Sequence, residues 1–152
     1  MKNQNKLAIV GIGNELCKDD GFGILVIREL KKKKLNLGTL IEGGTSGLSL
    51  IPLFFEYENL IFIDILKIDD EPGSIYIIPL EELGFRKINH VSIHDIGLED
   101  VYIRAKMLGS KVNGYLVGIV PKDYYGFGEI SDVLRTKIDT FIKQVIQLSR
   151  KL

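Results

Sequence analysis

Two carboxylates and one histidine carry the chemistry that this chain could perform. Asp20 lies in Asp19-Asp-Gly-Phe-Gly23, at the start of a predicted helix, and Asp64 interrupts the apolar run Leu60–Leu66. His94 lies just before a second predicted helix. Two carboxylate oxygens and one imidazole nitrogen suit a borderline divalent ion such as nickel, zinc or cobalt. These residue types therefore predict a metal-contacting site, provided that the fold brings them to one place.

Each of these residues also has a structural interpretation. Asp20 and its neighbour Asp19 are common types at a helix N-cap, although two adjacent acids suggest that one caps and the other points elsewhere. A buried Asp64 is costly unless it is paired, but near the carboxyl end of a strand it would face the ligand-binding edge. A lone histidine such as His94 is often a surface or capping residue, and His90 has even less context.

A glycine-rich segment, Gly43-Gly-Thr-Ser-Gly47, follows a short predicted strand. It could cradle a phosphate, contact a substrate or form a plain strand-to-helix turn. Three glycines in five residues exceed what a simple turn needs, so we predict a mobile, functional loop. Ser46 is not the nucleophile of a G-x-S-x-G elbow, because Leu48 occupies the position of the final glycine.

Several familiar motifs are missing from the sequence. There is no H-E-x-x-H zinc motif and no Walker lysine motif. Gly11 and Gly13 lack the third glycine of a dinucleotide fingerprint, because position 16 is leucine. Glu42, at the end of the second predicted strand, could still act as a ribose-binding acid, so a nucleotide-binding enzyme stays open. The single cysteine, Cys17, is interpreted as an inert, small apolar residue.

The elements that must position these residues follow from the hydrophobic pattern. The 152 residues predict one domain over 1–152. Apolar runs predict strands over 7–12, 38–42, 59–66, 74–78 and 111–120. Helical periodicity predicts helices over 20–34, 48–55, 95–108 and 130–151. This order predicts an α/β fold with a mostly parallel five-stranded sheet and helices on both faces.

The overall composition excludes some classes of function. The chain holds 20 basic and 20 acidic residues, which argues against binding nucleic acid through a broad basic surface. No apolar run approaches the roughly 20 residues that span a bilayer, and the first six residues do not resemble a signal peptide. A single cysteine allows no internal disulfide. We therefore expect a cytoplasmic protein without a membrane or nucleic-acid partner.

Taken in order, the motifs resemble those of the [NiFe]-hydrogenase maturation endopeptidases. The matching segments are Gly11-Ile-Gly-Asn14 with Asp19-Asp-Gly-Phe-Gly23, Glu42-Gly-Gly-Thr-Ser-Gly47, Asp64, His94-Asp-Ile-Gly-Leu98 and the late strand Val117-Gly-Ile-Val-Pro121. The resemblance covers nearly the whole chain at similar spacing. No single motif is decisive, but their combination is specific.

This resemblance implies an endopeptidase that removes a short C-terminal extension from the hydrogenase large-subunit precursor once nickel has been inserted. The implied catalytic positions are Asp20, Asp64, Gly43, Gly44 and Thr45, and the implied metal contacts are Asp20, Asp64 and His94. Position 20 is glutamate in some members of the family and aspartate here. The implied fold is a three-layer, hydrolase-like α/β/α sandwich.

The resemblance also implies an unusual use of metal. Nickel is expected to arrive with the substrate, and no tightly held metal of the protein's own is expected. The precursor is then the partner, and we expect the protease itself to be a monomer. Whether the metal or a carboxylate activates water stays open at this point. Two alternatives also stay open: a nucleotide- or phosphate-binding α/β enzyme, and a non-catalytic hydrogenase assembly chaperone.

Overall fold

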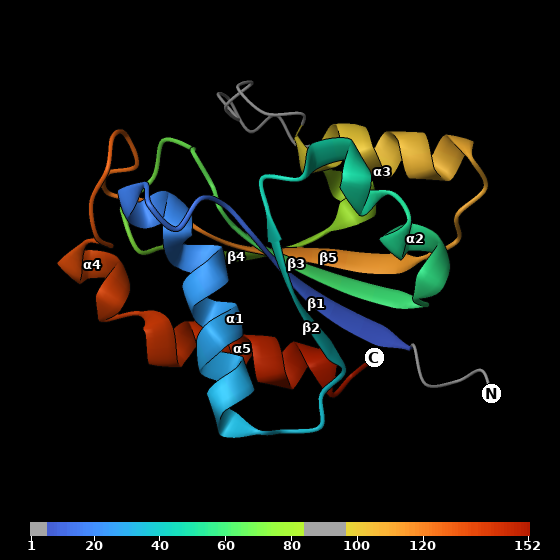
Figure 1. Ribbon diagram of the computed structural model, residues 1–152, viewed down its shortest axis with the longest axis horizontal. Helices are drawn as coiled ribbons and strands as arrows, with labels where there is room; N and C mark the ends of the chain where they lie inside the picture. The colour runs from blue at the N-terminus through green and yellow to red at the C-terminus, as the bar shows by residue number, and fades with distance from the viewer. Residues whose placement is uncertain (1–5, 84–96) are drawn as a thin grey trace.

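The computed structural model describes residues 6–83 and 97–152, which form a five-stranded sheet between two layers of helices (Figure 1). The strands are β1 (Leu7–Ile12), β2 (Thr39–Gly44), β3 (Asn59–Ile65), β4 (Ile75–Pro79) and β5 (Asn113–Ile119). Their order across the sheet is β2-β1-β3-β5-β4, in which only β4 runs antiparallel to its neighbour. The predicted fold class, a mostly parallel five-stranded α/β sandwich, is confirmed.

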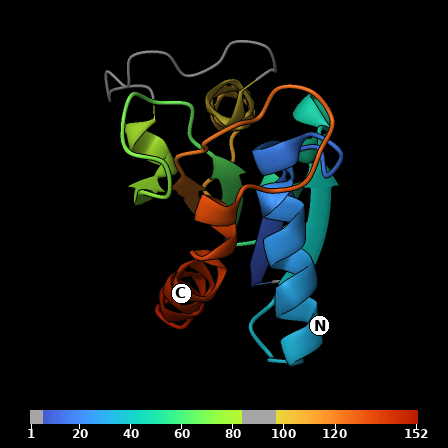
Figure 2. The same cartoon turned by 90° about the vertical axis from the view of Figure 1, so that its left-hand side faces the viewer.

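Helices cover both faces of this sheet (Figure 2). On one face lie α1 (Phe22–Lys33), the short α4 (Asp132–Arg135) and α5 (Ile138–Ser149). On the other face lie α2 (Leu53–Glu56) and α3 (Leu98–Met107). Short 3-10 turns are formed by η1 (Lys18–Gly21), η2 (Gly47–Leu50) and η3 (Leu80–Glu82). Within the described ranges no helix is both long and apolar enough to cross a membrane.

The core consists of two apolar layers, because successive strand side chains point to opposite faces. Ile61 and Ile63 of β3 pack with Phe22 of α1 and Phe141 of α5 on one face. Leu60 and Phe62 pack with Phe54 of α2 and Val101 of α3 on the other. Because both faces are covered, the central strands are apolar throughout, which is why their positions could be predicted from the sequence.

Three predicted boundaries are wrong in an informative way. The strand predicted over 38–42 continues to Gly44, so Gly43 and Gly44 belong to β2 rather than to a loop. The helix predicted over 48–55 is divided into η2 and α2, with Pro52 at the N-cap of α2. The helix predicted over 130–151 is two helices, because α4 ends at Arg135 and α5 begins at Ile138.

Candidate active site

The carboxyl ends of β1, β2 and β3 meet at one edge of the sheet. The backbone N–H of Gly13, just after β1, donates a 2.9 Å hydrogen bond to the carbonyl oxygen of Gly44, the last residue of β2. In the parallel register of β1 and β3, Gly11 lies opposite Ile63. Asp64 therefore lies level with the end of β1. Ligands bind at this edge of open α/β sheets, which makes it the candidate site.

Glycine allows helix α1 to approach this edge closely. A Cβ placed on Gly23 would lie 2.4 Å from the carbonyl oxygen of Ile12 and 2.7 Å from that of Ile63. A side chain at this position would collide with the ends of both strands. The first turn of α1 thus packs directly on β1 and β3, and the segment that carries Asp20 is held beside them.

Asp20 is half-buried and fixed against the turn that follows β1. Its Oδ2 accepts a 3.0 Å hydrogen bond from the backbone N–H of Asn14. A Cβ on Gly13, whose φ is +131°, would lie 1.9 Å from the carbonyl oxygen of Asp20. The helix-cap interpretation of Asp20 is wrong, because Gly21 is the N-cap of α1 and no side chain caps it. The Asp20 carboxylate instead contacts the turn after β1, at the edge of the sheet.

Asp19 has a different role from its neighbour, and this role was not predicted from the sequence. Asp19 is completely buried. Its carboxylate accepts hydrogen bonds from the backbone N–H groups of Lys122 (2.8 Å), Asp123 (3.1 Å) and Ser131 (2.7 Å), and from the Ser131 hydroxyl (2.9 Å). A buried carboxylate requires such donors. Asp19 therefore organises the loop between β5 and α4 rather than capping a helix, and its partners lie over 100 residues away.

Asp64 is the second-last residue of β3 and is half-buried. Its Oδ1 accepts a 2.8 Å hydrogen bond from the backbone N–H of Ile65. By strand alternation its side chain lies on the same face as Phe62, the face covered by α2 and α3. Because Asp64 lies level with the end of β1, the structure brings it to the same edge as Asp20.

The two histidines, His90 and His94, lie outside the described residues, so the predicted set of three metal contacts is not complete here. Within residues 6–83 and 97–152, no group of three or more His, Cys, Asp or Glu side chains could hold a metal ion. The assignment of His94 stays a prediction.

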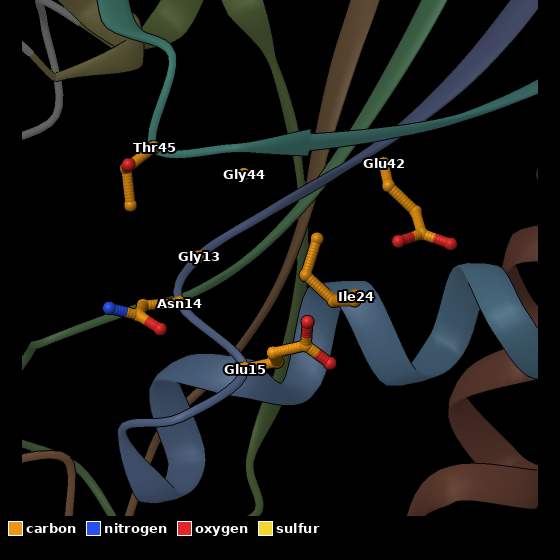
Figure 3. Close-up of a pocket in the computed structure, with 7 residues that line it drawn as sticks. All are labelled: Gly13, Asn14, Glu15, Ile24, Glu42, Gly44 and Thr45. Carbon is orange, nitrogen blue, oxygen red and sulfur yellow. The ribbon is translucent and has the colours of Figure 1, made fainter. Parts of the chain in front are cut away.

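A hollow of about 310 Å³ lies between the ends of β1 and β2, on the side of the sheet that α1 covers (Figure 3). Its lining residues are Gly13, Asn14, Glu15, Ile24, Glu42, Gly44 and Thr45. Gly44 and Thr45 are two of the catalytic positions that the family resemblance implies. They lie on the opposite side of the hollow from Asn14 and Glu15 (Figure 3). Asn14 connects the hollow to Asp20, because its N–H holds the Asp20 carboxylate.

Two acids that line this hollow, Glu15 and Glu42, pair with the same arginine. Arg28 of α1 donates to Glu15 at 2.5 Å and to both oxygens of Glu42 at 3.1 and 3.4 Å. The hydrogen bond from Arg28 holds the pKa of Glu42 below its ordinary value. Lys31 also pairs with Glu42, at 3.5 Å. These ion pairs occupy the carboxylate proposed to bind a nucleotide ribose, so they argue against the nucleotide-binding alternative.

Gly44 combines an unusual backbone with free space. Its φ is +60°, a conformation that side chains other than glycine rarely adopt, and a Cβ placed there would meet no atom within 4 Å. Gly43 is buried at the end of β2, and its carbonyl oxygen accepts a hydrogen bond from the hydroxyl of Ser46. The backbone at Gly44 is therefore open to an approaching ligand, whereas Gly43 is part of the sheet.

Comparison with known proteins agrees with this architecture. A family model described as hydrogenase maturation protease matches residues 24–148. The hydrogenase expression/formation protein HupD of Bradyrhizobium diazoefficiens is 30% identical over 128 residues, which cover 82% of this chain and 67% of HupD. The hydrogenase 2 maturation protease of Escherichia coli is 25% identical over 150 residues, covering 96% of this chain and 92% of that protein.

A solved structure shows the same fold. The hydrogenase maturating endopeptidase HybD from E. coli superimposes with a TM-score of 0.85 at 24% identity, over 96% of this chain and 93% of HybD. The fold is therefore that of a known maturation endopeptidase, and the family model covers most of the chain. This protein belongs to the hydrogenase maturation protease family.

Proposed function

We propose that this protein is an endopeptidase that removes the C-terminal extension of a [NiFe]-hydrogenase large-subunit precursor after nickel has been inserted. The observation that carries the proposal is that Asp64 lies at the end of β3 and Asp20 is hydrogen-bonded to the turn after the neighbouring strand β1, in a chain of the hydrogenase maturation protease family. Both carboxylates lie where an open α/β sheet binds its ligands.

In this proposal the nickel ion belongs to the substrate. Asp20, Asp64 and His94 would supply two carboxylate oxygens and one imidazole nitrogen, a set without thiolates that fits a borderline divalent ion and leaves coordination positions for the substrate's own ligands. Asp20 is suited to this role, since the Asn14 N–H orients one of its oxygens. The enzyme would thus bind a precursor that already carries nickel better than one that does not.

The end of β2 would hold the peptide that is cut. Gly44 leaves its backbone accessible, and Thr45 lines the same hollow. A peptide lying over Gly43–Thr45 would pass beside the turn at Asn14 and reach Asp20. Water would then be activated by a carboxylate of the protein or by the nickel ion of the substrate, and the two cases differ in whether a nickel-free precursor is cleaved at all.

The test compares nickel-loaded with nickel-free precursor. The purified protein is incubated with each, and loss of the C-terminal extension is followed by mass spectrometry. We expect cleavage of the loaded form only. Equal cleavage of both forms would overturn the role of nickel but leave the peptidase assignment, whereas binding without any cleavage would favour the assembly-chaperone alternative.

A matched pair of variants tests the histidine assignment. His94→Ala should abolish processing, whereas His90→Ala should retain it, because only His94 lies in the His94-Asp-Ile-Gly-Leu98 motif. Neutral imidazole is the ligating form, so cleavage should also weaken below the ordinary His pKa of about 6.5. Equal losses in the two variants would contradict the choice of His94.

A further inference from the structure

The loop between β5 and α4, residues 120–131, is fastened to the segment that carries Asp20. The N–H of Lys18 donates to the carbonyl of Gly128, and the N–H of Gly128 donates to that of Leu16, both at 3.0 Å. The N–H of Asp19 donates to the carbonyl of Asp123 at 3.0 Å. Both ribbon views show the two segments side by side (Figures 1 and 2).

Side chains reinforce this attachment. The buried Asp19 carboxylate accepts four hydrogen bonds from the loop, as described above. Lys18 forms a 2.8 Å ion pair with Asp123, and its hydrogen bond holds the pKa of Asp123 below the ordinary value. The backbone of the loop is therefore fixed relative to Asp20.

The same loop also contacts the segment that carries the other candidate acid. The ammonium group of Lys67 lies 4.7 Å from the centre of the Tyr124 ring, a cation–π contact. Lys67 follows Asp64 by three residues, just beyond the end of β3. The loop thus joins the two segments that position Asp20 and Asp64.

Three large apolar side chains project from this junction into solvent. Leu16 is 62% exposed, Tyr125 67% and Phe127 82%. Gly126, with a φ of +78°, makes the turn that separates the two aromatic residues. We call Leu16, Tyr125 and Phe127 the rim patch. Exposed aromatic side chains on a fixed backbone are typical of binding hot spots, because little freedom remains to be lost on binding.

Position distinguishes the rim patch from the exposed apolar residues at the end of α3. Met107 and Leu108, at the end of α3, are 81% and 66% exposed. They precede β5, whose first residue, Asn113, donates its N–H to the carbonyl of Glu58 just before β3. They therefore lie toward the amino ends of the strands, at the edge opposite to the candidate site.

Resting on the proposed function, we propose that the rim patch is the docking surface for the folded body of the hydrogenase precursor, and that it binds an apolar cluster next to the extension. The N–H of Leu16 donates to Asn14 Oδ1 at 3.0 Å, and the N–H of Asn14 donates to Asp20, so we expect a protein substrate whose extension reaches Asp20 to contact Leu16. The acids of the loop, Asp123 and Glu129, are paired with Lys18 and Arg135. Because the acids around the rim patch are already paired, an apolar partner surface matches this region.

The experiment compares two double variants that remove similar exposed apolar side chains. Leu16→Ser with Phe127→Ser changes the rim patch, and Met107→Ser with Leu108→Ser is the matched control. Affinity for the nickel-loaded precursor is measured by biolayer interferometry, in proteins that also carry Asp64→Asn to prevent cleavage. KM and kcat are measured without that substitution, and circular dichroism checks the fold.

We expect the rim-patch variant to raise Kd and KM by about tenfold or more, a change of about 1.4 kcal/mol, with little change in kcat. The control should match the parent protein. Parental Kd and KM in the rim-patch variant, or equal losses in both variants, would overturn the proposal. So would a self-association, seen by sedimentation, that the rim-patch substitutions abolish without changing precursor affinity.

The proposed function and the docking surface fail separately in this design. If the parent protein binds the precursor through the rim patch but never cleaves it, the docking surface stands and the peptidase assignment falls. If the parent protein cleaves the precursor and the rim-patch variant binds and cleaves equally well, the peptidase assignment stands and the docking surface falls.

Discussion

The adjacent aspartates Asp19 and Asp20 have different roles because their side chains contact different partners. Asp19 is buried under backbone donors of a distant loop, while Asp20 is half-buried at the open edge of the sheet. The sequence suggested that one acid caps a helix and the other points elsewhere. The structure contradicts the cap, because no side chain caps α1. The role of Asp19 could not be predicted, because most of its partners are backbone groups that leave no pattern in the sequence.

Replacing Asp19 by alanine should destabilise the protein strongly. The change removes the charged acceptor of the N–H groups of Lys122, Asp123 and Ser131, and a hydrogen bond to a charged group is worth about 1.5–3 kcal/mol. We expect a loss of about 3 kcal/mol or more in the free energy of unfolding, measured by urea titration. Asp69→Ala, at an exposed position, is the control and should stay within about 0.5 kcal/mol of the parent. A loss no larger than that of the control would show that Asp19 is not structural.

Asp64→Asn should separate chemistry from folding. The amide keeps the shape of the side chain and an oxygen that can accept from the Ile65 N–H, so the fold should persist. The negative charge is lost, and with it the proposed contact to the substrate's nickel. We expect cleavage of the nickel-loaded precursor to fall about a hundredfold or more, while the urea midpoint changes little. Near-parental cleavage would remove Asp64 from the site.

At the scale of elements, the site is built by strand ends that the sequence pattern could locate. Continuous apolar runs marked the central strands because both faces of the sheet are covered. Asp64 stood out because it interrupts such a run, and Asp20 because it is one of two adjacent acids at the start of a predicted helix. The division between α4 and α5 could not be predicted, because the apolar stripe continues across it. Ser131, the N-cap of α4, is fixed there by Asp19, 112 residues away.

The role of the end of β2 can be tested through its last residue, Gly44. Gly44→Ala places a side chain at a φ of +60°, which costs about 1–2 kcal/mol, and it covers backbone that the substrate is proposed to approach. We expect the cleavage rate per folded molecule to fall by more than the loss of stability explains. Gly109→Ala is a matched control, since Gly109 also has a positive φ, of +100°, and open space, but lies after α3. Equal cleavage per folded molecule in both variants would mean that Gly44 only ends the strand.

At the scale of the whole molecule, equal numbers of acidic and basic residues leave no net charge, so local pairs decide how the protein responds to pH. The balance of charge in the sequence argues against a broad basic surface, but it could not show which charges pair. Arg28 joins α1 to β2 through Glu42, and Lys18 joins η1 to the loop after β5 through Asp123. Such contacts depend on the folded chain, and so does the rim patch, in which Leu16 is over 100 residues from Tyr125 and Phe127 in sequence.

These contacts predict that the protein loses stability in acid. The pKa values of Glu42, Asp70 and Asp123 are lowered by hydrogen bonds from Arg28, Tyr76 and Lys18, respectively. A carboxyl group with a lowered pKa in the folded state stabilises that state above its unfolded pKa of about 4, and the contribution disappears as pH falls through the folded value. The free energy of unfolding should therefore be level from pH 7 to about 5 and decline below about pH 4.5.

Urea titrations between pH 7 and pH 3 measure this dependence. Glu42→Gln cannot titrate at that position, so its decline in acid should be shallower than that of the parent protein. Because the paired groups are exposed, 1 M NaCl should also reduce the part of the decline that comes from the ion pairs of Arg28 and Lys18. A free energy of unfolding that rises from pH 5 to pH 3 would mean that these contacts do not couple protonation to folding, since groups with lowered pKa values can only lose stabilising effect in that range.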